Sequence, residues 1–586
     1  MEHPLRRWLA AFVIGCLASG AAMLLQNVLR DVWQIRGLPE RVEEWLLLFV
    51  PLDLFEQGLA RFGADAKELA LTGTEIGMAL VLVAVGALVI HAGWRGWALL
   101  GLGVGLWLLT MVVVMPVTGA GVFATGLQVS PLLTDSGYLL VFLAFATVLA
   151  GGGMLLDGAA HVAARQQMQE RRALLAGLVA AIVAGGVAIV TGREGGQVAS
   201  SLPLAVAPTP PPATPTSTAA AAAAPAATAQ ATLQPGPQAP APVAAPPTAV
   251  PSPTPVPLPN PPVSRPLARN QDGSLTAAGR PKGTLSPPVT SNDDFYIVTK
   301  NAVADPVVDA ETWRLVIDGE VNNPVQLDYR TLVALPAVDI TKTLECISNF
   351  TAACNLTSFG CDLLSTARFH GARLSDVLDL AGGLKSTAVG LAILSTDEFS
   401  AGLTVDVVQD PETLIAYQMN DQPLPREHGF PARLLVPGRY GMKNPKWLSG
   451  IRAMTEEYLG WYEQRNWNPV GIVKTMSRID TPADGASLPP GDQQVAGIAY
   501  AGTRGVQQVE ISLDNGVSWQ PTTFIEPMAD DDTMVRWQTR FTMPSSGSLS
   551  ITVRATDATG ELQTDEFVLP QPDGASGQDM ITVNAA

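Results

Sequence analysis

The stretch AYQMNDQPLPREHGFPARLLVPGRYGMKNPKWL, residues 416–448, decides the fold of the second half of this 586-residue chain. Its apolar segment FPARLLVPG predicts a short buried strand bounded by Gly and Pro turns. Outward from it, similar strands such as TWRLVIDGEV alternate with helical stretches such as RLSDVLDLAGG. Residues 291–476 are therefore predicted to form a mixed α+β domain.

The C-terminal part, residues 477–586, carries only strand signals. Four of them are QQVAGIAYAG, VQQVEISLDNGVSW, MVRWQTRFTM and SLSITVRATDATG, and Gly, Asp and Asn turns separate them. This spacing predicts a small all-β antiparallel sandwich of the immunoglobulin type.

The N-terminal part, residues 1–192, is predicted to be an α-helical transmembrane anchor. Five stretches are each about 20 residues long and nearly free of charge, which is the length needed to cross a bilayer core. They are residues 8–29, 76–93, 97–117, 137–156 and 173–191. In the outer connection between the first and second spans, residues 41–62 (RVEEWLLLFVPLDLFEQGLARF) are typical of an amphipathic helix at the membrane interface.

The basic residues predict the orientation of these spans. Arg6 and Arg7 precede the first span, and Arg171 and Arg172 precede the fifth, whereas residues 118–136 contain no Lys or Arg. Basic residues concentrate on the cytoplasmic side. We therefore expect a multi-pass protein of the cell membrane whose C-terminal part lies outside the cytoplasm.

Residues 193–290 are predicted to be a disordered, Pro/Ala-rich linker. From residue 195 to residue 264 there is no Lys, Arg, Asp or Glu, and such a composition cannot bury enough apolar surface to fold. A tether of this kind would let the domain beyond it move widely.

The charge lies almost entirely in the part beyond the linker. Residues 291–586 contain 20 Lys and Arg against 38 Asp and Glu, while the whole chain has a net charge of −17. An acidic surface argues against nucleic acid and anionic lipid as partners. It favours a basic, diffusible protein.

Three of the four cysteines lie close together, at positions 346, 354 and 361. Outside the cytoplasm cysteines are usually paired, and the segment between Cys354 and Cys361 could close a short disulfide loop. Cys346 would then be left over, either as an inert buried thiol or as a metal ligand. A lone thiolate suits a metal that a cofactor already holds through sulfur.

Several motifs in one order resemble the sulfite oxidase family of molybdopterin enzymes. The resemblance covers about residues 291–570 and is carried by the 416–448 stretch together with DDFYIVTKN (293–301), WRLVIDGEV (313–321), TLECISN (343–349), DLLSTARFHGARLSDVLDLAG (362–382) and VEISLDNGVSW (509–519). It implies a molybdopterin domain followed by an immunoglobulin-like dimerisation domain. It also implies oxygen-atom transfer at molybdenum, coupled to two-electron redox.

The resemblance also implies which residues form the site. Cys346 would be the thiolate ligand to molybdenum, and Trp467 aligns loosely with the active-site tyrosine of the family. The residues that would bind the molybdopterin are Thr299, Lys300, Asn301, Asp397, His428, Arg433, Asn444 and Lys446. On residue type alone, the cations among them could equally be surface salt bridges.

The sequence departs from the family where the substrate would bind. Sulfite oxidases place an arginine five residues after the ligand cysteine, and this chain has Thr351 there. Losing a cation weakens the binding of a small dianion such as sulfite. A sulfite-oxidising enzyme, an S- or N-oxide reductase and a non-catalytic tethered scaffold are thus all open. No haem motif occurs, so an enzyme would need an external electron-transfer protein such as a cytochrome, and a homodimer is possible.

Overall fold

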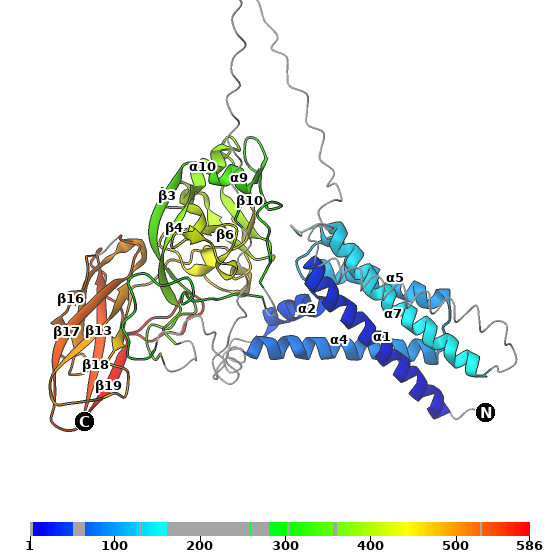
Figure 1. The fold of residues 1–586 in the computed structure, drawn as a ribbon, viewed down its shortest axis with the longest axis horizontal. Helices are drawn as coiled ribbons and strands as arrows, with labels where there is room; N and C mark the ends of the chain where they lie inside the picture. Colours follow the sequence, from blue (N-terminus) through cyan, green and yellow to red (C-terminus); the bar gives the residue numbers. More distant parts are fainter. Residues whose placement is uncertain are drawn as a thin grey trace, which may run out of the picture.

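The computed structural model describes residues 4–50, 65–125, 127, 131–160, 258–259, 281–301, 305–354, 360–527 and 530–586. The predicted fifth span at 173–191 and almost all of the predicted linker lie outside these residues. Figure 1 shows three parts: a helical bundle, a mixed domain and a β-sandwich at the C-terminus.

The helical bundle confirms four of the predicted spans as apolar helices. Apolar windows long enough to cross a membrane cover Arg7–Trp33, Leu69–His91, Trp97–Val117 and Pro131–Leu156. The helices are α1 (Pro4–Trp33), α2 (Leu38–Leu46), α4 (Asp65–His91), α5 (Trp97–Leu109), the π-helical turn η2 (Thr110–Val114), α6 (Met115–Val117) and α7 (Pro131–Ala160), with short 3-10 turns η1 (Leu47–Phe49) and η3 (Val122–Ala124). The short α2 carries the first part of the predicted amphipathic helix.

The long helices alternate in direction. Ser19 Oγ donates to the carbonyl oxygen of Ala79, and one turn earlier in α1 a Cβ at Gly15 would lie 2.7 Å from the carbonyl oxygen of Val83. Because the partner in α4 moves forward as the position in α1 moves back, α1 and α4 run antiparallel. A Cβ at Gly103 would lie 2.7 Å from the carbonyl oxygen of Phe142, and Trp107 Nε1 donates to the carbonyl oxygen of Asp135 at 3.0 Å, so α5 and α7 are antiparallel too. Small residues allow this close approach of helices in a membrane.

The mixed domain contains two sheets. One has the order β2-β1-β10-β5-β6 and the other the order β3-β4-β7-β8, with β9 paired to β7. Their bounds are β1 (Arg314–Gly319), β2 (Val325–Asp328), β3 (Ala337–Glu345), β4 (Leu364–Arg373), β5 (Gly390–Ser395), β6 (Ser400–Thr404), β7 (Leu414–Met419), β8 (Gln422–Pro423), β9 (Arg433–Leu435) and β10 (Leu448–Met454), with helices α9 (Tyr329–Val333) and α10 (Leu374–Asp379) and 3-10 turns η6 (Val405–Gln409), η7 (Arg426–His428), η8 (Gly441–Lys443) and η9 (Glu463–Arg465). The predicted α+β class is confirmed.

The C-terminal part is the predicted two-sheet sandwich. Its sheets have the orders β11-β13-β17-β16 and β12-β19-β18-β14-β15. Its elements are β11 (Met476–Thr481), β12 (Ser487–Leu488), β13 (Gly491–Tyr500), η10 (Gly502–Arg504), β14 (Val506–Ser512), β15 (Gln520–Pro521), β16 (Thr523–Phe524), β17 (Val535–Met543), β18 (Ser548–Asp557) and β19 (Met580–Ala585). Alternating apolar residues of both sheets, including Trp537, fill the space between them.

A buried polar junction joins the sandwich to the mixed domain. Lys342 of β3 forms an ion pair with Asp532, and these side chains are 1% and 4% exposed. Asp532 Oδ1 also accepts a hydrogen bond from the Tyr500 hydroxyl at 2.7 Å, and the backbone N–H of Gly438 donates to Oδ2 at 3.2 Å. Because β3 leads directly to residue 346, this junction fixes the strand that presents the cysteine.

Candidate cofactor and active site

One cavity in the mixed domain gathers most of the predicted site residues. The space between its lining residues is about 730 Å³, which includes volume open to solvent. Eight of the ten predicted residues line it: Thr299, Lys300, Cys346, Asp397, His428, Arg433, Asn444 and Lys446. The other two, Asn301 and Trp467, do not line it. Residues far apart in the sequence thus converge on one site.

Cys346 lies at the turn that follows β3. Its backbone N–H donates to the carbonyl oxygen of Leu363 at 2.9 Å, and its own carbonyl oxygen accepts from the N–H of Asn349 at 2.9 Å. The Asn349 side chain fixes this turn, because it donates to Glu345 Oε1 and accepts from the N–H of Leu363, both at 2.9 Å. The thiol is free and only 8% of the residue is exposed.

The other two cysteines of this region are paired. Cys354 and Cys361 form a disulfide bond, the pairing that the sequence left open as possible. Their pairing leaves Cys346 as the one cysteine with a free thiol in the described part of the catalytic region.

Burial sets the protonation of the groups at this turn. Burial raises the pKa of the Cys346 thiol, although hydrogen bonds from Ser348 oppose this. Burial likewise raises the pKa of the neighbouring Glu345 to about 8. The thiol is therefore protonated at neutral pH unless a bound cation stabilises the thiolate.

The link between η7 and β9 places His428 and Arg433 on the same wall. Gly429 lies between them with φ of 110°, a conformation that glycine adopts readily. A Cβ at Gly429 would lie 3.0 Å from the Cβ of Lys446 and 3.2 Å from that of Arg433. A glycine at position 429 therefore allows His428, Arg433 and Lys446 to lie close together.

Arg433 is a buried cation with unused donor capacity. It is 4% exposed, and its two terminal nitrogens donate to the backbone carbonyl oxygens of His428 (3.2 Å) and Asn444 (3.1 Å). Its Nε has no hydrogen-bond partner among the described residues. Burial lowers the pKa of Arg433 to about 10, so the guanidinium is charged at neutral pH but poorly compensated. Such a group fits an anionic ligand, as the phosphate of a molybdopterin would be.

His428 and Lys446 complete this wall. Burial, together with Lys446 and Arg433, lowers the pKa of His428 to about 3, so its ring is neutral. His428 Nε2 donates to the carbonyl oxygen of Asn292 at 3.0 Å, which leaves Nδ1 as an acceptor. Lys446 Nζ donates to the carbonyl oxygens of Val298 (3.1 Å) and Glu427 (2.8 Å).

Asn444 lines the cavity but uses its side chain to shape the loop. Its Oδ1 accepts from the backbone N–H of Val436 at 2.7 Å, and its Nδ2 donates to the carbonyl oxygens of Tyr440 (2.9 Å) and Arg439 (3.2 Å). The side chain therefore supports the polypeptide between β9 and β10, while its backbone carbonyl holds Arg433.

Thr299, Lys300 and Asp397, the last in the turn between β5 and β6, also line the cavity. Asn301 Nδ2 donates to Asp397 Oδ2 at 3.1 Å. Asn301 does not line the cavity, but it orients Asp397, which does. Burial raises the pKa of Asp397, although Lys300 opposes this. Thr299 Oγ1 donates to Asp305 Oδ1 at 2.7 Å.

Tyr462, five positions before Trp467, is one of the aromatic residues that line the cavity. The rings of Tyr462 and Trp467 are in edge contact, with centroids 6.2 Å apart, and it is Tyr462 that lines the cavity. Burial raises the pKa of Tyr462, so it is a neutral phenol. The sequence reasoning also missed Tyr296, Phe399, Met442 and Trp447 in the lining. The sequence signal that could have found Tyr462 is the second tyrosine in EYLGWYEQRNW, which an alignment to Trp467 leaves out.

Two family models match the part of the chain that forms these domains. Residues 302–462 match the model described as "Oxidoreductase molybdopterin binding domain". Residues 471–569 match "Mo-co oxidoreductase dimerisation domain". Both fall on the domains that the structure describes as mixed and β-sandwich.

The chain is also similar in sequence to known sulfite oxidases and to a nitrate reductase. The chain is 32% identical over 272 residues to the sulfite oxidase of Arabidopsis thaliana, covering 39% of this chain and 69% of that protein. It is 31% identical over 294 residues to the mitochondrial sulfite oxidase of Rattus norvegicus, covering 44% and 54%, so it spans about half the length of that relative. A nitrate reductase [NADH] of Ulva prolifera is 29% identical over 270 residues, covering 38% and 31%. The chain therefore belongs to the sulfite oxidase family of molybdopterin oxidoreductases, and that membership implies a molybdenum-bearing molybdopterin as its cofactor.

Proposed function

We propose that this protein is a membrane-tethered molybdopterin oxidoreductase that performs oxygen-atom transfer outside the cytoplasm. The observation that carries the proposal is the convergence on one cavity of eight residues that the family resemblance implies, among them a free, buried thiol. A structural thiol would need neither the cavity nor the surrounding cations.

The residues present fit the cofactor. When bound, it would supply oxygen-atom transfer coupled to two-electron redox. Cys346 would be the metal's protein ligand, because the described residues contain no group of three or more His, Cys, Asp and Glu side chains that could hold a metal alone. Arg433 would bind an anionic group of the cofactor through its unpartnered Nε. The neutral His428 ring would accept a hydrogen bond at Nδ1, and Tyr462 would present a phenol proton to the cavity.

The helix directions support an odd number of membrane crossings. Four alternating spans return residue 160 to the side on which α1 begins. The catalytic domain, however, contacts the segment just after α1 ends, since the Gln34 side chain bonds both to the carbonyl oxygen (2.9 Å) and to the N–H (3.1 Å) of Val307. One more crossing between residues 161 and 280 would reconcile the two, and residues 173–191 are the apolar stretch that could supply it. With the basic residues inside, the catalytic domain then lies outside the cytoplasm.

The substrate is proposed to be a small molecule that exchanges an oxygen atom with the cofactor. It is either sulfite, which accepts the oxygen atom, or, in the reverse direction, an S- or N-oxide, which donates it. Thr351 favours the second class. It stands where the family has a substrate-binding arginine, and it is buried with a hydroxyl that has no hydrogen-bond partner among the described residues. The lining adds apolar groups such as Met442 and Phe399, which suit a neutral substrate better than a dianion.

Partners are proposed from charge and from the family. The acidic surface of residues 291–586 suits a basic electron-transfer protein such as a cytochrome. The match to a dimerisation domain supports a homodimer through the sandwich.

The test is the metal content of the full-length protein, measured by mass spectrometry alongside Cys346→Ser. We expect about one molybdenum per chain in the wild type and very little in the variant. Molybdenum missing from the wild type would leave the non-catalytic scaffold as the better reading. Metal retained in Cys346→Ser would remove the thiolate from the site. Assays with artificial electron carriers against sulfite, sulfoxides and N-oxides would then separate the substrate classes.

A further inference from the structure

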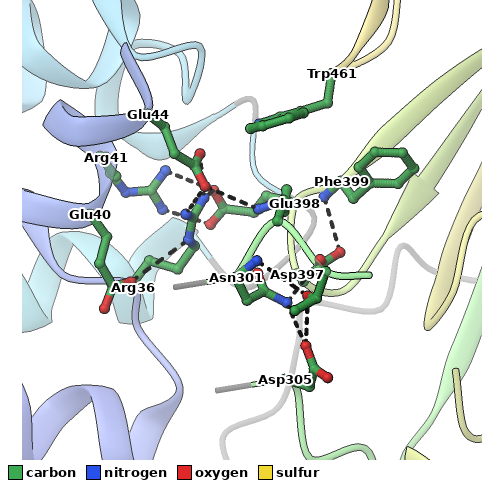
Figure 2. Close-up of polar contacts among 12 residues, drawn as sticks. Arg36, Glu40, Arg41, Glu44, Asn301, Asp305, Asp397, Glu398, Phe399 and Trp461 are labelled. Atoms are coloured by element: carbon green, nitrogen blue, oxygen red, sulfur yellow. Dashed lines mark hydrogen bonds and ion pairs between the residues drawn. The ribbon is translucent and has the colours of Figure 1, made fainter. Parts of the chain in front are cut away.

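The segment after α1, residues 34–46, contacts the catalytic domain through a network of charged side chains (Figure 2). Arg41 Nη1 and Nη2 donate to the two carboxylate oxygens of Glu398 at 2.8 and 2.6 Å, a bidentate pair. Arg36 donates to Glu44 at 3.0 Å and also to Glu398 at 3.4 Å. Two residues from the anchor thus hold one carboxylate of the catalytic domain.

The anchor holds Arg41 rigidly from behind. Arg41 Nε donates to the hydroxyl of Tyr138 on α7 at 3.1 Å, and that hydroxyl donates to the carbonyl oxygen of Arg36 at 2.6 Å. The Arg41 side chain is only 3% exposed and that of Glu398 is 16% exposed. A guanidinium oriented in this way loses little further freedom when it binds a carboxylate.

Glu398 itself is an unusual residue for its position. It lies in the turn between β5 and β6 with φ of 64°, where glycine is the usual residue. A glutamate in this conformation strains the backbone. Its carboxylate, which pairs with Arg36 and Arg41, gives a physical reason for its presence.

The network extends to the cofactor cavity. Lys300, which lines the cavity, has its Nζ 3.5 Å from Glu44 Oε1. Glu398 directly follows Asp397, which also lines the cavity and accepts from Asn301. Arg465 Nη2 donates to the backbone carbonyl oxygen of Glu44 at 3.2 Å. The anchor therefore contacts Lys300, which lines the cavity, and Glu398, the neighbour of a second lining residue.

The groups of this network are charged. Burial alone would raise the pKa of Glu44, but Arg36 and Lys300 outweigh it and lower that pKa well below its usual range. Burial would also raise the pKa of Glu398, which Arg41 and Arg36 lower instead. Fully ionised partners make the contact specific for the sign of each charge.

We propose that residues 34–46 are a docking site for the catalytic domain on its own membrane anchor, and that Glu44 is a positioning residue for Lys300. The docked anchor contacts Lys300, which lines the cofactor cavity. The domain would then work at a fixed place on the membrane, rather than moving widely on a tether. Since both partners belong to one chain, even a modest interface keeps the docked state populated. The role of Glu44 rests on the proposed function, whereas the docking does not.

The docking is tested by cross-linking the full-length protein in detergent. Cysteines at Gln34 and Val307, which touch in the docked state, are joined by a short bifunctional thiol reagent in a Cys16→Ser background. Arg41→Glu and Glu398→Arg should each slow cross-linking at least about tenfold. Together they restore the opposite charges and should recover most of the rate. The matched control is Arg368→Glu, which breaks an exposed ion pair with Asp421 elsewhere on the domain and should change nothing.

Two results would overturn the docking proposal. One is cross-linking that neither single charge reversal slows. The other is a double variant as slow as the singles, which would mean that the pairing does not determine the contact. Rescue by the double variant also excludes misfolding as the cause of the single effects.

The positioning role is tested by molybdenum retention during dialysis. Glu44→Gln should cross-link normally but lose molybdenum several-fold faster than the wild type, because Lys300 is no longer held, and Glu44→Asp should be intermediate. Retention equal to the wild type would remove Glu44 from the cofactor site and leave the docking intact. A wild type without molybdenum would instead refute the proposed function, whatever the cross-linking shows.

Discussion

Replacing Lys342 with methionine should strongly destabilise the junction between the catalytic domain and the sandwich. The change leaves the carboxylate of Asp532 buried at 4% exposure, with only the Tyr500 hydroxyl and the Gly438 N–H as donors. Breaking a buried ion pair by removing one partner costs about 3–5 kcal/mol. Asp532→Asn should cost a similar amount, because it leaves the lysine ammonium buried without a counter-charge.

The double variant separates the charge from the packing. Lys342→Met with Asp532→Asn removes both charges, while the amide at 532 can still accept from Tyr500. We therefore expect it to recover at least about 2 kcal/mol relative to the sum of the singles. Arg452→Met, which breaks an exposed pair with Asp318, serves as the control and should cost less than about 1 kcal/mol.

Hydrogen exchange of the full-length protein in detergent measures this junction directly. Peptides from β3 and β13 should lose protection by roughly 10²–10⁴-fold in each single variant, which is the stated free energy expressed as an equilibrium constant. Unchanged protection in Lys342→Met would contradict the reasoning. So would a double variant no better protected than the singles.

Three further predictions concern the cavity. In cofactor-free protein, folded His428 stays neutral, whereas His428 of the unfolded chain takes up a proton below about pH 6.5, so the free energy of unfolding decreases as the pH is lowered. Between pH 7 and 5.5 the wild type should therefore lose about 1 kcal/mol of stability relative to His428→Gln in thermal unfolding. Arg433→Met should lower molybdenum content by roughly 10–100-fold, and Arg433→Lys less, because lysine keeps the positive charge that faces the anion. Equal content in the two variants would exclude a charge contact with an anion. Tyr462→Phe should reduce turnover by about 10²-fold at nearly unchanged stability, and Trp467→Phe far less; the reverse order would restore Trp467 as the reacting residue.

Local patterns predicted the elements well. The alternation in MVRWQTRFTM became β17, and the apolar FPARLLVPG became β9 with Arg433 at its first position. Four apolar windows became long helices, because an uncharged segment of that length has few other stable conformations. Cysteine spacing allowed the Cys354–Cys361 disulfide but did not decide it.

What the sequence could not give were contacts between distant segments. Tyr462 rather than Trp467 reaches the cavity because η9 and the packing of Trp461 turn the chain there, and no periodic pattern records that turn. Asn444 reads as a cofactor ligand in its motif, yet its side chain is used by the backbone of its own loop. Glu398 reads as an ordinary surface acid, and its partner Arg41 is 357 positions away.

The Cys354–Cys361 bond has a practical consequence for anyone handling the protein. The native chain presents one thiol in its catalytic region, and a reducing agent added during purification would raise that number to three within sixteen positions. Reoxidation could then join residue 346 to a neighbour and block the thiolate that we propose as the molybdenum ligand. Preparations made without reductant should therefore hold more metal, and low occupancy after such treatment would reflect scrambled sulfur bonds rather than a weak site.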